Sequence, residues 1–185
     1  MSRNDTLRIA GIMRESIVDG PGIRYAVFCQ GCPHDCPGCH NPETHDFAGG
    51  YDMKIEDILK EFDEDPLLAG MTLSGGEPLC QPEAFASLAR QVRRRGKNVT
   101  LFTGYRLEDL VAFAAGGNPD IIPPARTPEG REAVKVLLAN TDVLIDGPFI
   151  EAERDISLKF RGSRNQRVID MGETLKRGEI ILYEE

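Results

Sequence analysis

Residues 24–39 read RYAVFCQGCPHDCPGC, and this stretch decides which fold we expect. Its first part, residues 24–30, is a run of the residue types that favour β-strands. Its second part carries Cys32, Cys36 and Cys39 among glycines and prolines that bend the chain. The stretch therefore predicts a strand that opens, at its carboxyl end, into a loop with three neighbouring thiols.

The rest of the chain alternates in the same way. Further strands are predicted at residues 71–74, 99–103 and 143–146. Apolar residues at helical spacing predict helices over residues 55–62, 85–92 and 107–114. Thr127-Pro128-Glu129 is typical of a helix start, and this fourth helix is predicted to run to about Leu138.

Alternating strands and helices indicate βαβ units in an α/β fold with a mainly parallel sheet. In such folds the chemistry lies in loops at the carboxyl ends of the strands. Residues 115–124 are rich in glycine and proline and predict a loop. Past Asp146 the alternation stops, and residues 167–170 with 180–183 predict a terminal β-hairpin. The length of 185 residues predicts a single domain over residues 1–185.

Composition restricts the possible partners. The chain has 30 acidic and 22 basic residues, a net charge of −8, so we expect no nucleic-acid partner. No run approaches the roughly 20 apolar residues of a membrane span, and we expect no membrane partner. The polar start, Met1 to Asp5, has no apolar signal region. We therefore expect a cytoplasmic protein.

The five cysteines are unevenly placed. Four lie between Cys29 and Cys39 and the fifth is Cys80, a pattern unlike the disulfide framework of a secreted protein. Metal-binding thiols fit this pattern better. Cys29, at the end of the predicted strand, is expected to be a small buried apolar residue, and Cys80 is expected to be structural.

Two kinds of metal site compete for the cysteine loop. A [4Fe–4S] cluster normally takes four thiolates, so three would leave one iron open for another ligand. The alternative is a closed zinc or Fe–S site formed by Cys32, Cys36, Cys39 and His40 in a non-catalytic binding module. The gaps of three and then two residues favour the cluster, because zinc sites usually pair their cysteines.

The CxxxCxxC spacing is identified as the signature of the radical S-adenosylmethionine (SAM) superfamily. Residues 18–24 (VDGPGIR), 32–41 (CPHDCPGCHN) and 73–78 (LSGGEP) resemble the activases of glycyl radical enzymes. Residues 103–105 (TGY), 143–147 (VLIDG) and 160–167 (FRGSRNQR) resemble the activating proteins of anaerobic, class III ribonucleotide reductases.

This resemblance implies a partial, open βα barrel and an oxidoreductase. A [4Fe–4S] cluster held by Cys32, Cys36 and Cys39 would cleave SAM to a 5′-deoxyadenosyl radical. The radical would take a hydrogen from a glycine of anaerobic ribonucleoside-triphosphate reductase. A one-electron donor such as flavodoxin or ferredoxin is also implied. An activase for another glycyl radical enzyme, such as pyruvate formate-lyase, is the alternative.

The resemblance also assigns residues to SAM. Gly75 and Gly76 are expected to let the backbone come close to SAM, and Glu77 is expected to accept from its ammonium group. Gly38 stands where many relatives have an aromatic residue, so His40 is expected to contact the adenine instead. Thr103 and Asp146 are expected to orient the ribose or the carboxylate. The full expected set for SAM is Gly38, Cys39, His40, Gly75, Gly76, Glu77, Pro78, Thr103 and Asp146. The set expected to bind the partner is Asp19, Arg24, Arg161, Arg164 and Arg167.

Overall fold

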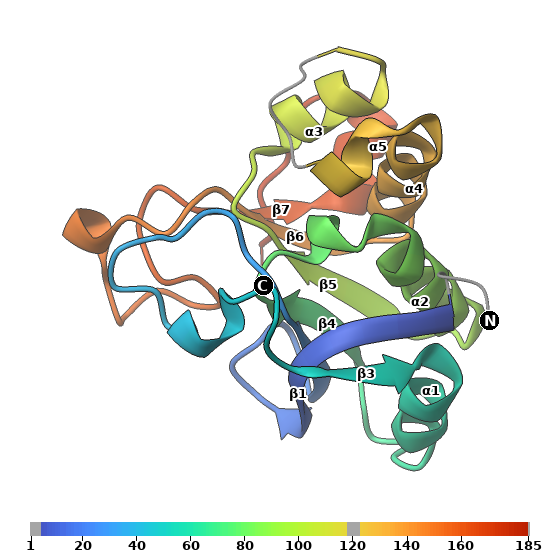
Figure 1. Cartoon of the computed structure of the whole chain (residues 1–185). Helices are drawn as coiled ribbons and strands as arrows, with labels where there is room; N and C mark the ends of the chain where they lie inside the picture. Colours follow the sequence, from blue (N-terminus) through green and yellow to red (C-terminus); the bar gives the residue numbers. More distant parts are fainter. Residues whose placement is uncertain (1–4, 118–122, 185) are drawn as a thin grey trace.

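The computed structural model describes residues 5–117 and 123–184, and in these ranges the chain forms a seven-stranded sheet of order β3-β1-β2-β4-β5-β6-β7 (Figure 1). The strands are β1 (Thr6–Ser16), β2 (Arg24–Cys29), β3 (Tyr51–Lys54), β4 (Gly70–Gly75), β5 (Asn98–Phe102), β6 (Val143–Asp146) and β7 (Arg167–Asp170). The central strands β2, β4, β5 and β6 are parallel, and antiparallel strands flank them. The α/β class with an open sheet is thereby confirmed. Strands β1 and β3 were not predicted.

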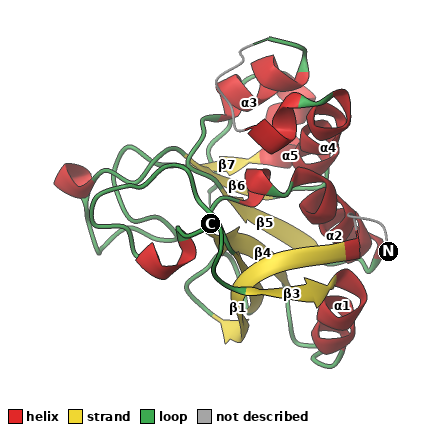
Figure 2. Cartoon of the chain, in the orientation of Figure 1, coloured by secondary structure: helices red, strands yellow, loops and turns green. Residues whose placement is uncertain are grey.

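The α-helices gather on one side of the sheet, whereas the opposite side carries long loops with short 3-10 turns (Figure 2). They are α1 (Ile55–Asp63), α2 (Pro82–Arg94), α3 (Leu107–Ala114), α4 (Pro128–Ala139) and α5 (Met171–Arg177). The first four are the predicted helices. Thr127 caps α4 as expected, since its hydroxyl accepts from the N–H of Gly130 at 3.0 Å. No helix in the described ranges is both long and apolar enough to cross a membrane.

Alternation along the parallel strands separates two faces. Val27, Leu73 and Leu101 are fully buried in the core that the helices cover. Their neighbours Thr72 and Thr100 carry polar side chains to the other face, where the loop between β1 and β2 lies: the Thr72 hydroxyl donates to the carbonyl of Asp19 at 2.7 Å. This second face leads to the carboxyl ends of the strands.

The predicted terminal hairpin is wrong in its connection. Strand β7 forms where expected, but helix α5 follows it because Asp170 caps the helix by accepting from Glu173 N–H, and Gly178, at φ 71°, ends it. The chain then returns beside β7, where Asp170 N–H donates to Ile181 at 2.9 Å. Of the predicted loop 115–124, residues 118–122 lie outside the described residues, and Pro123 begins a 3-10 turn that runs to Arg126.

Candidate active site

A cavity of about 730 Å³ lies at the carboxyl ends of the parallel strands. The β2–β3 loop (residues 30–50) and the β6–β7 loop (residues 147–166) enclose it and run side by side at the left of Figure 1. Of the residues expected to bind metal, cofactor or partner, those that line the cavity are Asp19, Cys32, Cys36, Cys39, His40, Gly75, Gly76, Thr103 and Arg161. The fold therefore brings most of the expected site together.

The Gly75-Gly76 turn is packed directly against the start of the cysteine loop. Gly76 N–H donates to Cys29 at 2.9 Å, and the next N–H, of Glu77, donates to Gly31 at 2.9 Å. Gly75 has φ 98°, and a Cβ on Gly76 would lie 2.4 Å from the Gly31 carbonyl oxygen. Only glycine fits both positions without displacing backbone, so the turn presents bare backbone to the cavity.

A backbone N–H donates to the sulfur of Cys39, and backbone N–H groups near Cys32 and Cys36 oppose the rise that burial causes in their pKa values. Burial raises the pKa of Cys32 to about 11, and the N–H of His34 opposes this rise. Burial likewise raises the pKa of Cys36, against a hydrogen bond from the N–H of Phe149. The N–H of Asn41 donates to Cys39 Sγ at 3.4 Å. Metal ligation needs thiolates, and such donors stabilise charge on ligating sulfurs.

Among the described residues, no three Cys, His, Asp or Glu side chains converge on one metal ion. The thiolate ligands of a cubane bind separate irons and stay apart. Three cysteines that line one cavity, one of them with an N–H donor to its sulfur, fit such a cluster. Cys29 is confirmed as a buried core residue on the helix-covered face, and Cys80 is buried in the same core.

Glu77 is fully buried and does not line the cavity. Its carboxylate accepts from Thr103 Oγ1 at 3.0 Å and from the N–H groups of Gly104 and Leu79 at 2.9 and 3.1 Å. His34 Nε2 lies 2.8 Å from Glu77 Oε2. The carboxylate thus holds Thr103, Gly104 and His34, which do line the cavity. Its contact with the SAM ammonium group stays a prediction.

Two other residues of the expected cofactor set also lie outside the cavity lining. Pro78 is buried behind it. Gly38 is exposed, and a Cβ there would lie 2.9 Å from Glu151 Oε1. Gly38 therefore allows the β6–β7 loop to approach the cysteine loop.

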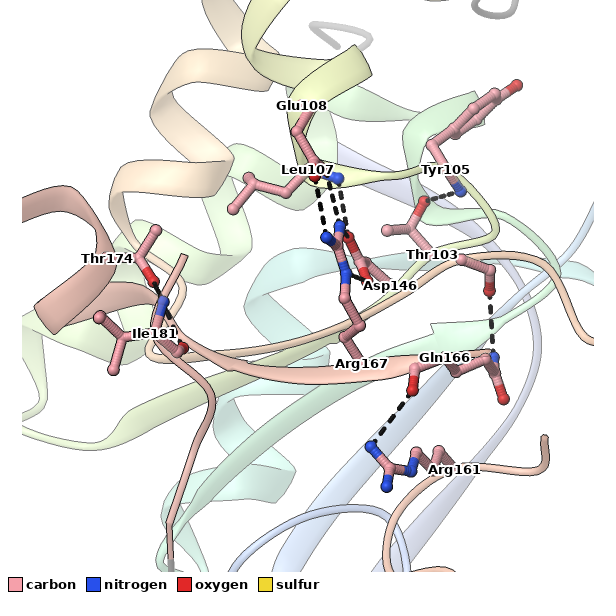
Figure 3. A network of polar contacts seen from close by, with 11 residues as sticks. Thr103, Tyr105, Leu107, Glu108, Asp146, Arg161, Gln166, Arg167, Thr174 and Ile181 are labelled. Atoms are coloured by element: carbon pink, nitrogen blue, oxygen red, sulfur yellow. Dashed lines mark hydrogen bonds and ion pairs between the residues drawn. The ribbon is translucent and has the colours of Figure 1, made fainter. Parts of the chain in front are cut away.

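Asp146 does not face the cavity, so its expected role toward SAM is wrong. Alternation along β6 places it on the helix-covered face, with zero exposure. There its carboxylate accepts from Leu107 N–H at 2.8 Å and from Arg167 Nε at 2.9 Å (Figure 3). Asp146 therefore anchors the start of α3 and the start of β7.

Arg24 is not available to a partner or to a cofactor. Its side chain is fully buried, where it donates to Thr72 at 3.1 Å and to the Met71 carbonyl at 2.6 Å, and pairs with Asn98. Burial lowers the pKa of its guanidinium to about 10. Arg24 links β2 to the neighbouring strands at their amino ends, whereas the cysteine loop lies at the carboxyl end of β2.

The predicted docking arginines have different surroundings. Arg167 is not free for docking, since it pairs with Asp146 and, at 2.9 and 2.7 Å, with both oxygens of Glu108 (Figure 3). These bonds raise the pKa of Arg167, and they lower that of Glu108 to about 2.

Arg164 is exposed beside Asp155, and its Nε lies 3.1 Å from Asp155 Oδ2. Arg161 lines the cavity and donates to the Gln166 carbonyl at 3.2 Å. Docking by Arg161 and Arg164 stays a prediction.

Three consecutive residues bind three others in the opposite order. Asn165 Nδ2 donates to Pro148 O at 2.7 Å, Gln166 Nε2 donates to Gly147 O at 3.1 Å, and Arg167 pairs with Asp146. We call Asn165, Gln166 and Arg167 the clamp. The clamp joins the two stretches 143–147 and 160–167 that the sequence singled out, and it fixes the β6–β7 loop where that loop leaves the sheet.

Sequence reasoning missed two residues of this site, His34 and Phe149. His34 lies within the cysteine loop and contacts Glu77. Phe149 lines the cavity, and its ring centroid is 5.0 Å from that of His40. Its position three residues past the end of a predicted strand was the signal that could have identified it.

Comparison with known families agrees with this geometry. Residues 18–169 match the model of the family described as "4Fe-4S single cluster domain". The anaerobic ribonucleoside-triphosphate reductase-activating protein of Vibrio cholerae is 32% identical over 159 residues, which cover 81% of this chain and 89% of that protein. Its counterpart in Escherichia coli K12 is 33% identical over 161 residues, which cover 82% of this chain and 91% of that protein.

A second group of relatives is more partial. The pyruvate formate-lyase-activating enzyme of Clostridium pasteurianum is 41% identical over 106 residues, which cover 53% of this chain and 44% of that enzyme. The likeness to the first group thus spans most of both chains, and the likeness to the second spans about half.

Proposed function

Because the chain belongs to the 4Fe-4S single cluster domain family, together with the anaerobic ribonucleoside-triphosphate reductase-activating proteins, we propose that it generates the glycyl radical of such a reductase. The match over most of both chains carries this proposal. The chain is a radical SAM enzyme of the glycyl-radical-activating kind, and its cofactors are a [4Fe–4S] cluster and SAM. This family membership replaces the alternative of a non-catalytic zinc module.

We propose that Cys32, Cys36 and Cys39 would hold the cluster and that the backbone of the Gly75-Gly76 turn would hold SAM in the same cavity. When bound and reduced, the cluster supplies one electron to the sulfonium, which splits into methionine and a 5′-deoxyadenosyl radical. The chemistry that the bound cofactors would supply is therefore the abstraction of one hydrogen atom from a glycine of the partner. The chain's own contribution is to bind and orient SAM and to exclude water from the cavity.

Glu77 is buried behind the residues that line the cavity and supports this arrangement from there. It holds Thr103, Gly104 and His34 at the cavity, and it can accept from the SAM ammonium group once His34 leaves Oε2. We propose both roles for Glu77. Cys39, Gly76 and Thr103 would contact SAM directly, since they line the cavity.

We propose that the reductase presents its glycine loop at the mouth of the cavity. Ile17 and Val18 on one side and Ile156 on the other line the cavity, yet are 76%, 68% and 93% exposed. Large apolar side chains so exposed around a site are typical of a surface that a protein partner covers. Asp19 and Arg161, which line the same cavity, would bind the backbone of that loop.

The electron donor and the location are also proposals. Reduction of a single cluster takes one electron, which a flavodoxin or a ferredoxin can supply. The five free thiols, Cys29, Cys32, Cys36, Cys39 and Cys80, suit a reducing compartment, and we propose the cytoplasm. We further propose one domain over residues 1–185, because one sheet includes strands from both ends of the chain.

The test is formation of the glycyl radical. Anaerobically reduced protein with SAM is mixed with class III reductase or, separately, with pyruvate formate-lyase, and the glycyl doublet is recorded by electron paramagnetic resonance. We expect the doublet with the reductase. A doublet with the lyase alone would instead assign the alternative activase function.

A further inference from the structure

Ser74 lies in the floor of the cavity without a hydrogen-bond partner. Its side chain lines the cavity, and the residue is only 8% exposed. Among the residues that the structure describes, none donates to the Ser74 hydroxyl or accepts from it. Thr103, which also lines the cavity, by contrast donates to Glu77 at 3.0 Å. A nearly buried hydroxyl without a partner costs free energy, so its position in an open cavity indicates a ligand that completes its hydrogen bonds.

Two phenylalanines stand on either side of Ser74. Phe28 on β2 is paired with Ser74 on β4, and the register between β4 and β5 places Phe102 on its other side. All three residues line the cavity, and we call them the floor row. Because adjacent strands are about 4.8 Å apart, the backbones of the two phenylalanines are separated by roughly 10 Å, with only the small serine between them.

The floor row is where the cavity ends. Two residues earlier on β4 and β5, the loop between β1 and β2 covers Thr72 and Thr100, and neither lines the cavity. The Thr72 hydroxyl donates to the Asp19 carbonyl, and a Cβ on Gly20 would lie 3.0 Å from the Thr100 hydroxyl oxygen. Among the three hydroxyls on these two strands, that of Ser74 is therefore the one open to the cavity.

Resting on the proposed function, we propose that Ser74 hydrogen-bonds the backbone of the partner segment that carries the reactive glycine, and that Phe28 and Phe102 make the floor selective for glycine. A serine hydroxyl both donates and accepts, so it can bind a peptide C=O or N–H. Between two phenylalanines, a segment can reach this hydroxyl only where no side chain projects toward the floor. Glycine has no side chain, and Ser74 directly precedes the Gly75-Gly76 turn that would hold SAM.

The chemistry of the floor row fits a polypeptide backbone. A neutral amide needs single hydrogen bonds and apolar contact, which a hydroxyl between two phenylalanines provides. The floor row carries no charge, whereas the ammonium and carboxylate groups of SAM call for opposite charges. The floor is also continuous with the proposed docking rim, because exposed Val18 is followed by Asp19, whose carbonyl is bound to the strand of Ser74.

The test separates SAM binding from use of the glycine. The full chain with its cluster is reduced anaerobically with SAM and class III reductase. The glycyl radical is counted by electron paramagnetic resonance and 5′-deoxyadenosine by chromatography in the same sample. In Ser74→Ala, the number of glycyl radicals per 5′-deoxyadenosine is expected to fall about threefold or more, because a hydrogen bond that aligns the glycine is lost. SAM affinity, measured by equilibrium dialysis, is expected to stay within about twofold.

Ser87→Ala is the matched control, since it removes a hydroxyl from α2, outside the cavity lining. It should match the wild type in both measurements. Ser74→Val removes the hydroxyl and also fills the space between the phenylalanines, so it should lower the radical ratio further while SAM still binds.

Glycine selectivity has its own readout, which uses reductase deuterated at every residue type except glycine. With the wild type, 5′-deoxyadenosine should carry almost no deuterium. Phe28→Ala widens the space above Ser74 and should raise the deuterium content about threefold or more, because other residues then reach the radical. Phe28 is chosen because Phe102 also packs against the small core of Val143, Ile145 and Val168.

An unchanged radical ratio in Ser74→Ala overturns the role of Ser74, and a loss of SAM affinity there overturns it in favour of a SAM contact. Deuterium content unchanged by Phe28→Ala overturns the selectivity. Iron and sulfide are measured on each preparation, and if Ser74→Ala loses its cluster, Ser74→Val is compared instead. Failure of the wild type to form any glycyl radical on the reductase would contradict the proposed function itself.

Discussion

Arg167 and Asp146 form an ion pair between neighbouring strands, with Arg167 Nε 2.9 Å from Asp146 Oδ1. Asp146 is fully buried, so its carboxylate oxygens have this partner and the N–H of Leu107 in place of water. The pair begins β7 and ends β6 at the same level of the sheet. The pair therefore joins residues 143–147 to residues 160–167, the two stretches that resemble the reductase-activating proteins. Its role is to stabilise the fold.

We predict that Arg167→Gln destabilises the protein by roughly 3 kcal/mol, because it leaves Asp146 charged and buried without its cation. Chemical denaturation of both proteins checks this. The matched control is Arg177→Gln, which removes a surface pair with Glu173 and should cost no more than about 0.5 kcal/mol. Equal costs for the two substitutions would contradict the structural role of Arg167.

Glu108 gives a pH-dependent contribution of known sign. Its hydrogen bonds with Arg167 lower its pKa to about 2 from the ordinary 4.5. A depressed folded-state pKa stabilises the fold above the ordinary pKa, and this contribution is lost as pH falls toward the folded-state value. The difference in unfolding free energy between wild type and Glu108→Gln should therefore be constant above about pH 5 and shrink as pH falls toward about 2. A difference that grows on acidification would contradict the pairing.

The sequence predicted the central strands, four helices and the cysteine loop, because local periodicity and turn residues specify them. It missed β1, whose burial is irregular and whose pairing with β2 is interrupted by register shifts. It also assigned Asp146 and Arg24 to the active side. Asp146 lies at the end of β6, where a shift of one residue changes the face, and Arg24 lies at the amino end of β2, away from the cavity. No pattern of residue types fixes either placement. Contacts such as Gln166 with Gly147 depend on tertiary structure and leave no local signal.

We predict that Cys36→Ala removes the [4Fe–4S] signal and the cleavage of SAM, because Cys36 lines the cavity and supplies one of three ligands. Cys80→Ala should keep the cluster, since Cys80 lies in the helix-covered core. Iron, sulfide and the visible absorption of anaerobic preparations measure this. Loss of iron in the Cys80 variant with retention in the Cys36 variant would reverse the ligand assignment.

We predict that Glu77→Ala weakens SAM binding by roughly 1.5–3 kcal/mol while iron content stays near normal. The substitution removes the acceptor shared by Thr103, Gly104 and His34, and so loosens the wall that would hold the ligand. Anaerobic titration with SAM measures the change. Glu77→Gln keeps one acceptor oxygen and should lose less. Equal binding by all three proteins would remove Glu77 from the site.

The exposed apolar residues Ile17, Val18 and Ile156, which form the rim of the cavity, lead to a prediction about the protein partner. Ile156 is 93% exposed beside the cavity, so its apolar surface is unused in the isolated chain. If the glycine loop of the reductase covers it, Ile156→Asp places a charge in a desolvated interface and should raise the concentration of reductase needed for half-maximal glycyl radical formation by about tenfold or more. The radical yield should recover at saturating reductase, because the substitution affects docking and leaves the cysteines and the Gly75-Gly76 turn in place.

Leu67→Asp is the matched control: Leu67 is 75% exposed, lies between α1 and β4, and does not line the cavity. It should behave as the wild type. If both variants shift the half-maximal concentration equally, the effect is one of net charge, and the reductase does not dock at the rim around Ile156.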